Sequence, residues 1–359
     1  YKKEKTVFQL QYQLSTQDRQ YKNDSVDKTY TIFEDNQYAG KSHFADAFFS
    51  KSISKNIQWI SGVDFRYGSY HQTYISISKW GPYNDNFKDT FQYQTALYSS
   101  LLINDASNKW LLELGGRNNK HNRYGSNQTF TISPSYKLNA NIRFMASAST
   151  GYKAPSLYQL SYNEKLKPEE SFNREIGMEY KTNPLFIRAV YYNRTIENGI
   201  DYNYIDYNFF NYIQQKVNGL ELEFNWKANE KNNFSANYTL MNGQETNQNR
   251  VTTKDTITYN YLLKRPKNTA GIQWTYEVSP KLNFSMAARY ISKRYDVGGY
   301  AAADVSLKSY TLLNAHIQYK LNKHLLLYAD GQNLANAVFQ EINGYNTMGR
   351  MLMIGLRLK

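Results

Sequence analysis

The residue types that could carry out chemistry are few in this sequence and stand far apart. Cysteine is absent, which excludes thiolate metal sites and thiol nucleophiles. The histidines show no H-x-x-x-H spacing and no recognisable catalytic pairing with serine or aspartate. Gly115 and Gly116 lie in a strand pattern that no helix follows, which excludes a phosphate-binding loop. The five histidines are His43, His71, His121, His316 and His324. We therefore expect no enzymatic activity and no bound cofactor.

One short run offers oxygen atoms for a hard cation. Asn84 to Asn86, together with Asp89, are a weak match to a Ca²⁺-binding loop and fall well short of a complete one. A solvated loop is the simpler interpretation. Ca²⁺ binding by the loops is therefore a secondary hypothesis.

The abundant side-chain chemistry is aromatic, and it suits binding. The run DYNYIDYNFFNYIQQ, residues 201–215, holds more rings than a connector needs. Rigid aromatic surfaces with a few hydrogen-bond donors suit a large, partly apolar ligand. Alternatively, about half of the rings belong to the aromatic girdle of a membrane barrel. The rings are Tyr202, Tyr204, Tyr207, Phe209, Phe210 and Tyr212. We select Tyr204, Tyr207 and Phe209 as candidate ligand contacts.

Apolar and polar residues alternate through nearly the whole chain, which indicates the strands that must position these rings. In NIRFMASAS, residues 141–149, Ile142 lies on one face and Arg143 on the other. The runs 220–226 and 281–290 alternate in the same way. Each run is about 7 to 10 residues long, the length that a tilted strand needs to cross a bilayer. A face with both Arg and Glu suits a wet lumen better than a sandwich core.

Short and long connections alternate along the chain. Short polar turns occur at 54–56, 138–140, 181–184, 229–231, 279–280 and 322. Long connections occur at about 15–41, 69–90, 151–168, 196–213, 243–264, 292–308 and 333–346. Outer-membrane barrels sort their connections in this way, with short periplasmic turns and long outer loops. We expect an all-β fold, a transmembrane antiparallel β-barrel in the outer membrane, with about sixteen strands from Thr6–Leu14 to Thr347–Lys359.

Composition and charge agree with this class. The mean hydropathy is −0.71, which a barrel tolerates because its strands alternate lipid-facing and lumen-facing residues. The 34 tyrosines suit membrane interfaces. The net charge of +13 is dispersed, without a Lys/Arg block or a nucleic-acid-binding motif. Nucleic acid is therefore not an expected partner, whereas anionic lipid or anionic ligands are.

Two stretches resemble a known family. YKAPSLYQL, followed by LKPEES and EIGMEY, is similar to the barrel signature of TonB-dependent outer-membrane receptors, and QNLANAVFQEINGYNTMGRMLMIGLRLK is similar to their terminal hairpin. The resemblance implies a barrel of about 22 strands around an N-terminal plug with a TonB box. Residues 1–359 would then be the C-terminal part of the barrel, without the plug and the first strands. Expected partners are outer-membrane lipid and lipopolysaccharide, the TonB complex through the plug, and a surface lipoprotein in some relatives.

The resemblance extends to the vitamin B12 (cobalamin) transporter branch. It is carried by IDYNYIDYNFFNYIQQKVNGLELEF, LLKRPKNT and ARYISKRYD. It implies uptake of cobalamin or a related corrinoid, with Lys264 or Arg265 as the basic contact and Tyr300 as a contacting tyrosine. The branch usually has Arg where this chain has Lys264, and lysine binds as a point charge rather than as a bidentate fork. Tyr152 and Lys153 open the long connection at the barrel mouth and are further candidate contacts.

Two alternatives remain open, besides a barrel hydrolase, for which the sequence supplies no residues. The first is an iron-siderophore receptor of the same class, which differs in the ligand alone. The second is a passive sixteen-strand porin, a pore without a plug, which the strand number by itself favours.

Overall fold

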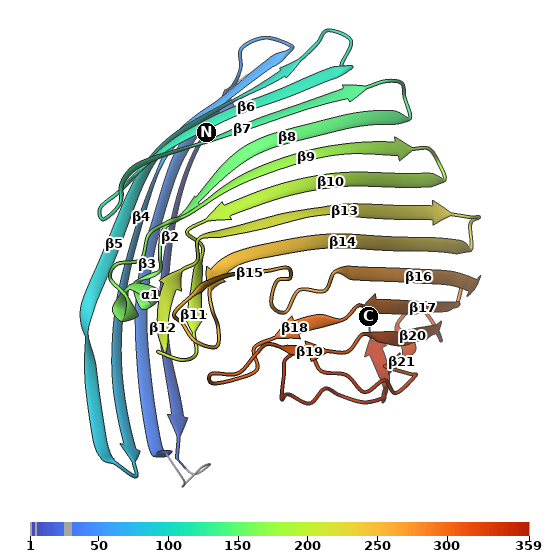
Figure 1. Ribbon diagram of the computed structural model, residues 1–359. Helices are drawn as coiled ribbons and strands as arrows, with labels where there is room; N and C mark the ends of the chain where they lie inside the picture. Colours follow the sequence, from blue (N-terminus) through green and yellow to red (C-terminus); the bar gives the residue numbers. More distant parts are fainter. Residues whose placement is uncertain (1, 4–5, 25–30, 359) are drawn as a thin grey trace.

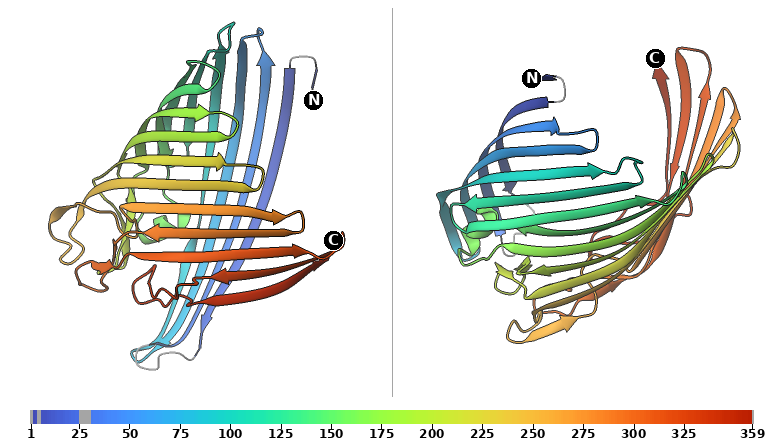
Figure 2. Two further views of the ribbon diagram at one scale, coloured as in Figure 1. Left: turned by 90° about the vertical axis from the view of Figure 1, so that its right-hand side faces the viewer. Right: turned by 90° about the horizontal axis from the view of Figure 1, so that it is seen from above.

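The computed structural model describes residues 2–3, 6–24 and 31–358, and its main element is a single antiparallel sheet. Eighteen strands form this sheet, and each long strand pairs with its neighbours in sequence. Figure 1 shows the sheet winding from β2 to β21 in a strongly curved wall. Figure 2 shows its two ends apart, so the sheet curves without closing over the described residues.

Sixteen of the eighteen strands form an up-and-down meander once the two-residue β1 and the four-residue β15 are set aside. This number agrees with the expectation from the sequence. The meander strands are β2 (Thr6–Asn23), β3 (Thr31–Ser52), β4 (Ile57–Ser78), β5 (Gly81–Asn104), β6 (Trp110–His121), β7 (Gly125–Lys137), β8 (Ile142–Lys153), β9 (Glu169–Lys181), β10 (Leu185–Glu197), β13 (Gln214–Lys227), β14 (Asn232–Gln248), β16 (Asn268–Ser279), β17 (Leu282–Ile291), β20 (Tyr310–Lys320), β21 (Leu325–Gln332) and β22 (Met351–Leu358).

The remaining elements are short. The last strand begins at Met351 rather than Thr347, and Lys359 lies outside the described residues. The long connections fold into two small hairpins and one helical turn. The short elements are β1 (Lys2–Lys3), α1 (Leu157–Tyr162), β11 (Ile200–Asn203), β12 (Asn208–Asn211), β15 (Thr256–Tyr259), β18 (Arg294–Asp296) and β19 (Val305–Leu307).

The two faces of the sheet differ in chemistry, as the alternation predicts. On one face Arg143 pairs with Glu179 at 2.8 Å, and Glu179 stands opposite Arg188 on β10. On the other face Ile354 of β22 is 84% exposed and Leu352 is 72% exposed. Apolar surface of this extent is stable where lipid covers it. The all-β fold with a lipid-facing and a lumen-facing side is therefore confirmed.

Stacked rings mark the end of the sheet that carries the short turns. Trp226 and Phe234 have ring centroids 5.5 Å apart, and Phe234 and Trp274 are 6.3 Å apart. Trp226 is 42% exposed on the lipid-facing side. Rings of this kind anchor a barrel at the membrane interface.

Two of the expected long loops, at 15–41 and 69–90, are wrong as loops. Paired β structure continues from Thr6 opposite Lys51 to Asn23 opposite Glu34. β4 and β5 remain paired up to Ser78 opposite Gly81. Beyond the membrane both faces of a strand meet water, so apolar alternation is lost while pairing continues. The part of the first connection at 25–30 lies outside the described residues.

The stretch between Lys153 and Glu169 contains a helical turn that the sequence analysis treated as loop. Ser156 caps α1, and the backbone N–H of Gln159 donates to its hydroxyl at 3.2 Å. The Gln159 side chain accepts from the Ser156 N–H at 2.9 Å, which completes a capping box. Among the described residues, no helix is long and apolar enough to span a membrane.

The two faces of β22 give a stability prediction. Replacing the lipid-facing Ile354 with Arg lowers the free energy of unfolding by about 2–4 kcal/mol near the bilayer midplane. The matched variant Met353→Arg, one residue away on the lumen side, costs much less because water solvates its guanidinium. Denaturant unfolding of the complete receptor in lipid vesicles measures both variants. Equal losses would contradict the assignment of the two faces.

Candidate ligand-binding site

A cavity of about 430 Å³ lies on the lumen side of the sheet, at the strand ends that the long connections join. Its lining comes from five parts of the chain: the ends of β8 to β10, the β11–β12 hairpin, the start of β13, the end of β14 with the segment up to Arg265, and the β18–β19 connection. Figure 1 shows these elements on the side opposite the short turns that join β9 to β10, β13 to β14 and β16 to β17.

Four of the residues selected from the sequence line this cavity. They are Lys153, Tyr204, Lys264 and Arg265. Lys153 ends β8, and Tyr204 follows β11. Lys264 and Arg265 lie in the segment before β16 and are here called the basic turn. Residues separated by more than one hundred positions are thus brought to one cavity.

The other four selected residues lie outside the cavity lining. Tyr300 is 66% exposed, although Gly299 and Ala302 beside it line the cavity. Tyr207 has a positive φ of 53° at the tip of the β11–β12 hairpin and is 59% exposed. The ring of Phe209 packs between those of Tyr158 and Tyr202. The Tyr152 hydroxyl is buried without a hydrogen-bond partner among the described residues.

An aromatic cluster supports the hairpin that carries Tyr204. Tyr202 contacts the ring of Tyr204 at 5.2 Å and that of Phe209 at 5.0 Å. Phe209 in turn contacts Tyr158 of α1 at 5.8 Å, and Tyr158 reaches Tyr70 of β4 at 6.1 Å. The hairpin is therefore packed, through α1, against the opposite wall of the sheet.

Polar contacts fix the same hairpin to the ends of the strands. The Ile200 N–H donates to Glu169 Oε1 at 3.3 Å, and the Asn211 side chain donates to the Lys167 carbonyl at 3.0 Å. The Lys167 N–H donates back to Asn211 Oδ1 at 2.8 Å. Since both strands of the hairpin are held to the segment at Lys167–Glu169, Tyr202 and Tyr204 reach the cavity in a defined orientation.

Basic groups on the cavity wall differ in how fully they are paired. Lys153 Nζ lies 2.9 Å from Glu169, and Lys264 Nζ lies 3.7 Å from Asp296. Arg194 and Arg265 make no ion pair within 4.0 Å among the described residues. Arg194 Nε is also buried without a hydrogen-bond partner. These positive groups can receive an anionic group of a ligand.

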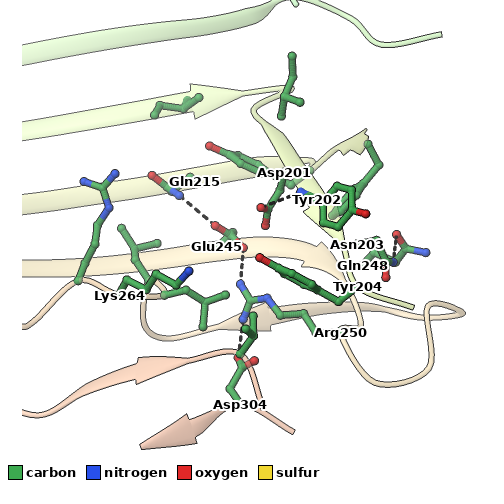
Figure 3. Close-up of a pocket in the computed structure, with 18 of the residues that line it drawn as sticks. Asp201, Tyr202, Asn203, Tyr204, Gln215, Glu245, Gln248, Arg250, Lys264 and Asp304 are labelled. Carbon is green, nitrogen blue, oxygen red and sulfur yellow. Dashed lines mark hydrogen bonds and ion pairs between the residues drawn. The ribbon is translucent and has the colours of Figure 1, made fainter. Parts of the chain in front are cut away.

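Sequence reasoning missed the acidic and amide groups of the cavity, which Figure 3 shows around Arg250. The Asp201 carboxylate accepts from the Tyr202 N–H at 2.8 Å, and Glu245 accepts from Gln215 Nε2 at 3.0 Å. Burial raises the pKa of Asp201, and the nearby Glu245 carboxylate raises it further. A carboxylate held in this way favours hydrogen-bond donors on a ligand. The polar run from Gly243 to Arg250 was a weak signal for these residues.

The candidate oxygen cluster on β5 lies away from this cavity. Asp85 accepts from the Tyr83 hydroxyl at 3.2 Å, and Asp89 pairs with His71. Within the part of the chain that the structure describes, no three His, Cys, Asp or Glu side chains come together as a metal site. Ca²⁺ binding at Asn84 to Asn86 stays a prediction.

Comparison with protein families places the chain in one of them. The family of TonB dependent receptor-like β-barrels matches residues 1–334, most of the 359 residues. The chain therefore belongs to the TonB-dependent receptor β-barrel family. This membership implies the outer membrane as its location.

Solved structures share the fold at low sequence identity. The ferric yersiniabactin uptake receptor FyuA from Yersinia pestis is 14% identical, with a TM-score of 0.77, over 100% of this chain and 59% of that one. The ferripyoverdine receptor of Pseudomonas aeruginosa is 16% identical, with a TM-score of 0.76, over 98% and 54%. The copper transporter OprC is 13% identical, with a TM-score of 0.77, over 98% and 62%. The chain thus spans about three fifths of the structures it matches.

Asp201 gives a prediction about pH. Because its pKa is raised in the folded chain, the folded state binds the proton more tightly, and stability falls as the pH rises above the unfolded value of 3.8. Asp201→Asn removes this cost, so the variant melts at a higher temperature than the parent at neutral pH. The difference closes as the pH falls towards 3.8. Thermal unfolding in detergent between acid and neutral pH measures it.

The exposed Asp206 on the same hairpin provides the control. Asp206→Asn should leave the melting temperature nearly unchanged at every pH, because its side chain remains in water. A melting temperature of Asp201→Asn that follows the parent at all pH values would show that Asp201 is not held in a buried environment.

Proposed function

We propose that the chain forms part of the barrel wall of an outer-membrane uptake receptor and that the cavity binds a metal chelate. The observation that carries the proposal is the meeting of the Tyr202–Tyr204 rings with the basic turn in one cavity at the end of the sheet with the long connections. Family membership supports the transport class. Rings would cover the apolar faces of a chelate while Lys264 and Arg265 receive its anionic groups.

The barrel itself does no bond chemistry in this proposal. The short turns face the periplasm and the cavity faces the outside, following the arrangement of outer-membrane barrels. A captured ligand would pass through the lumen when the TonB complex, driven by the proton gradient of the inner membrane, remodels a plug. Lipopolysaccharide and a surface lipoprotein remain proposed neighbours of the long connections.

The unpaired edges of the sheet support a larger barrel. Within the described residues β22 pairs with β21 alone, so one side of it leaves backbone N–H and C=O groups without strand partners. Such an edge cannot face hydrocarbon, because each unsatisfied group is costly there. We propose that further strands complete a barrel of about 22 strands around a plug. Closure of these sixteen strands upon themselves, as in a porin, is the alternative.

Two ligand classes fit the proposal. Cobalamin or a related corrinoid is the first, on the motifs that contain Lys264, Arg265 and Tyr300. A ferric siderophore is the second, favoured by the basic groups in the cavity and by the names of the structural neighbours, which include uptake receptors for ferric yersiniabactin and ferripyoverdine.

Calorimetric titration of cyanocobalamin and of a ferric catecholate into the complete receptor separates the two classes. We expect Tyr204→Ala and Arg265→Ala each to weaken binding of the true ligand by about tenfold, since each removes a contact worth about 1.4 kcal/mol. Lys264→Ala should act in the same direction. Tyr207→Ala, outside the cavity, is the matched control and should have little effect.

The outcomes decide between the alternatives. Binding of cyanocobalamin that also weakens in Tyr300→Ala supports the corrinoid branch. Binding of the ferric catecholate alone supports a siderophore receptor. A folded receptor that binds neither, and that conducts ions as an open pore in planar bilayers, would support the porin and contradict the uptake proposal.

A further inference from the structure

Arg250 stands at the centre of a buried ionic network beside the cavity. Its Nη1 lies 2.6 Å from Asp304 Oδ2, and its Nη2 lies 2.5 Å from Glu245 Oε1. Its guanidinium carbon lies 3.9 Å from the centre of the Tyr259 ring. The side chain is 12% exposed. The guanidinium is therefore enclosed on two edges and one face, as Figure 3 shows for its two carboxylate partners.

Among the described residues, Arg250 is the cation that lies within 4.0 Å of the two carboxylates. Glu245 and Asp304 are 7% and 4% exposed, and the ion pairs recorded for both among the described residues go to Arg250. Their other partners are neutral donors: Gln215 and Asn247 donate to Glu245, and the Tyr261 hydroxyl donates to Asp304 at 2.8 Å. Without Arg250, two buried negative charges would remain next to each other, which is strongly unfavourable.

A chain of contacts leads from this network to the basic turn. Tyr261, bonded to Asp304, stacks on Tyr295 of β18 with ring centroids 4.0 Å apart. The Lys264 N–H donates to the Tyr295 carbonyl at 2.6 Å. Arg250 also fixes its own loop, because its N–H donates to the Tyr259 hydroxyl at 2.9 Å. One residue thereby connects the β14–β15 connection, the basic turn and the segment before β19.

The basic turn needs such support because its backbone is strained. Lys264 has a φ of 61°, in the left-handed region that side chains other than glycine seldom adopt. A residue persists there when its surroundings hold it. Its Nζ is directed to Asp296, which is 1% exposed and also accepts from the Asn343 N–H at 2.8 Å. Lys264 is thus held at its backbone and at its side chain.

We propose that Arg250 is a positioning residue that holds the basic turn in its ligand-binding geometry through Asp304, Tyr261 and Tyr295, and that it does not itself bind the ligand. Its donors are already directed to two carboxylates, so a ligand gains little from it. The side chains that remain available to an anionic ligand are those of the basic turn. The test by ligand affinity rests on the proposed function. The test by hydrogen exchange of the loop, called the loop readout below, does not depend on it.

The loop readout needs no ligand. In Arg250→Met, hydrogen exchange of the backbone at 260–267 and 292–306 in the complete receptor should increase at least tenfold at neutral pH, because Glu245 and Asp304 separate. The double neutralisation Glu245→Gln/Asp304→Asn on the Arg250→Met background should return exchange towards the parent value. Lys254→Met, an exposed cation on the same connection, is the control and should leave exchange unchanged.

The pH profile distinguishes a charge effect from a simple loss of packing. In Arg250→Met the protection should recover as the pH falls, since protonation removes the repulsion between Glu245 and Asp304. The other titratable groups that face this region are Asp201 of β11, Tyr212, Lys264 of the basic turn, Tyr259 and Tyr261. In the neutralised triple variant no such recovery is expected. A lost packing contact would instead lower the protection factor, which is the exchange rate relative to that of a free amide at the same pH, equally at every pH.

Titration of cyanocobalamin and of the ferric catecholate completes the test. We expect Arg250→Met to weaken binding at least tenfold and the triple variant to recover most of it. A triple variant that regains slow exchange without regaining affinity would show that Arg250 contacts the ligand and would overturn the proposal. Unchanged exchange in Arg250→Met would also overturn it.

Failure of the proposed function is a separate result. If no variant and no parent receptor binds either probe, the uptake proposal loses its support, while the exchange data still decide the role of Arg250. Should Arg250→Met fail to insert in the membrane, the triple variant and Arg250→Lys take its place. If neutralising Glu245 and Asp304 restores membrane insertion and slow exchange, the charge-balancing role of Arg250 is supported. If the triple variant neither inserts nor exchanges slowly, that role is contradicted.

Discussion

The need to pair every backbone N–H and C=O group is the constraint on which the rest of this structure depends. In hydrocarbon no water can satisfy these groups, so a spanning chain must be helical or a closed sheet. Antiparallel pairing meets this demand between the neighbouring strands from Thr6 on β2 to Leu358 on β22, whereas the outer edge of β22 has no strand partner among the described residues. Because backbone pairing supplies the scaffold, few requirements remain for the side chains. Those on the outer face must be apolar, and those on the inner face can be any polar residue.

The same constraint places the candidate ligand-binding cavity at the ends of the strands. A ligand site needs convergent side chains, and neighbouring strands of a curved wall direct theirs across an open lumen. The long connections fold inward to solve this problem, and the β11–β12 hairpin and the basic turn lie over the lumen-facing ends of the strands. Connections without a ladder of their own need other anchors. Here these are the aromatic cluster around Phe209 on one side and the ion network around Arg250 on the other.

How far the sequence predicts this structure depends on the distance over which each signal acts. The strands of the membrane wall are encoded locally, since lipid on one side and water on the other impose a period of two at each strand. The loops expected at 15–41 and 69–90 were wrong because β2 to β5 continue into water, where that period has no cause. Tyr204 and Lys264, which line the cavity, were selected through ring density and a family motif. Asp201 and Arg250 were missed, because their roles arise from contacts between connections far apart in sequence.

The buried charges near the cavity are better explained by specificity than by stability. An ion pair removed from water gains little over apolar residues of the same size, because desolvation offsets the attraction. Arg250 nevertheless has two carboxylate partners, and a guanidinium with two fixed acceptors has very few alternative arrangements. Apolar side chains at these positions could repack in several ways and would leave the strained φ of Lys264 free to relax. In the role proposed for Arg250, the network would trade stability for a single geometry of the basic turn, and a fixed geometry is what a selective binding site needs.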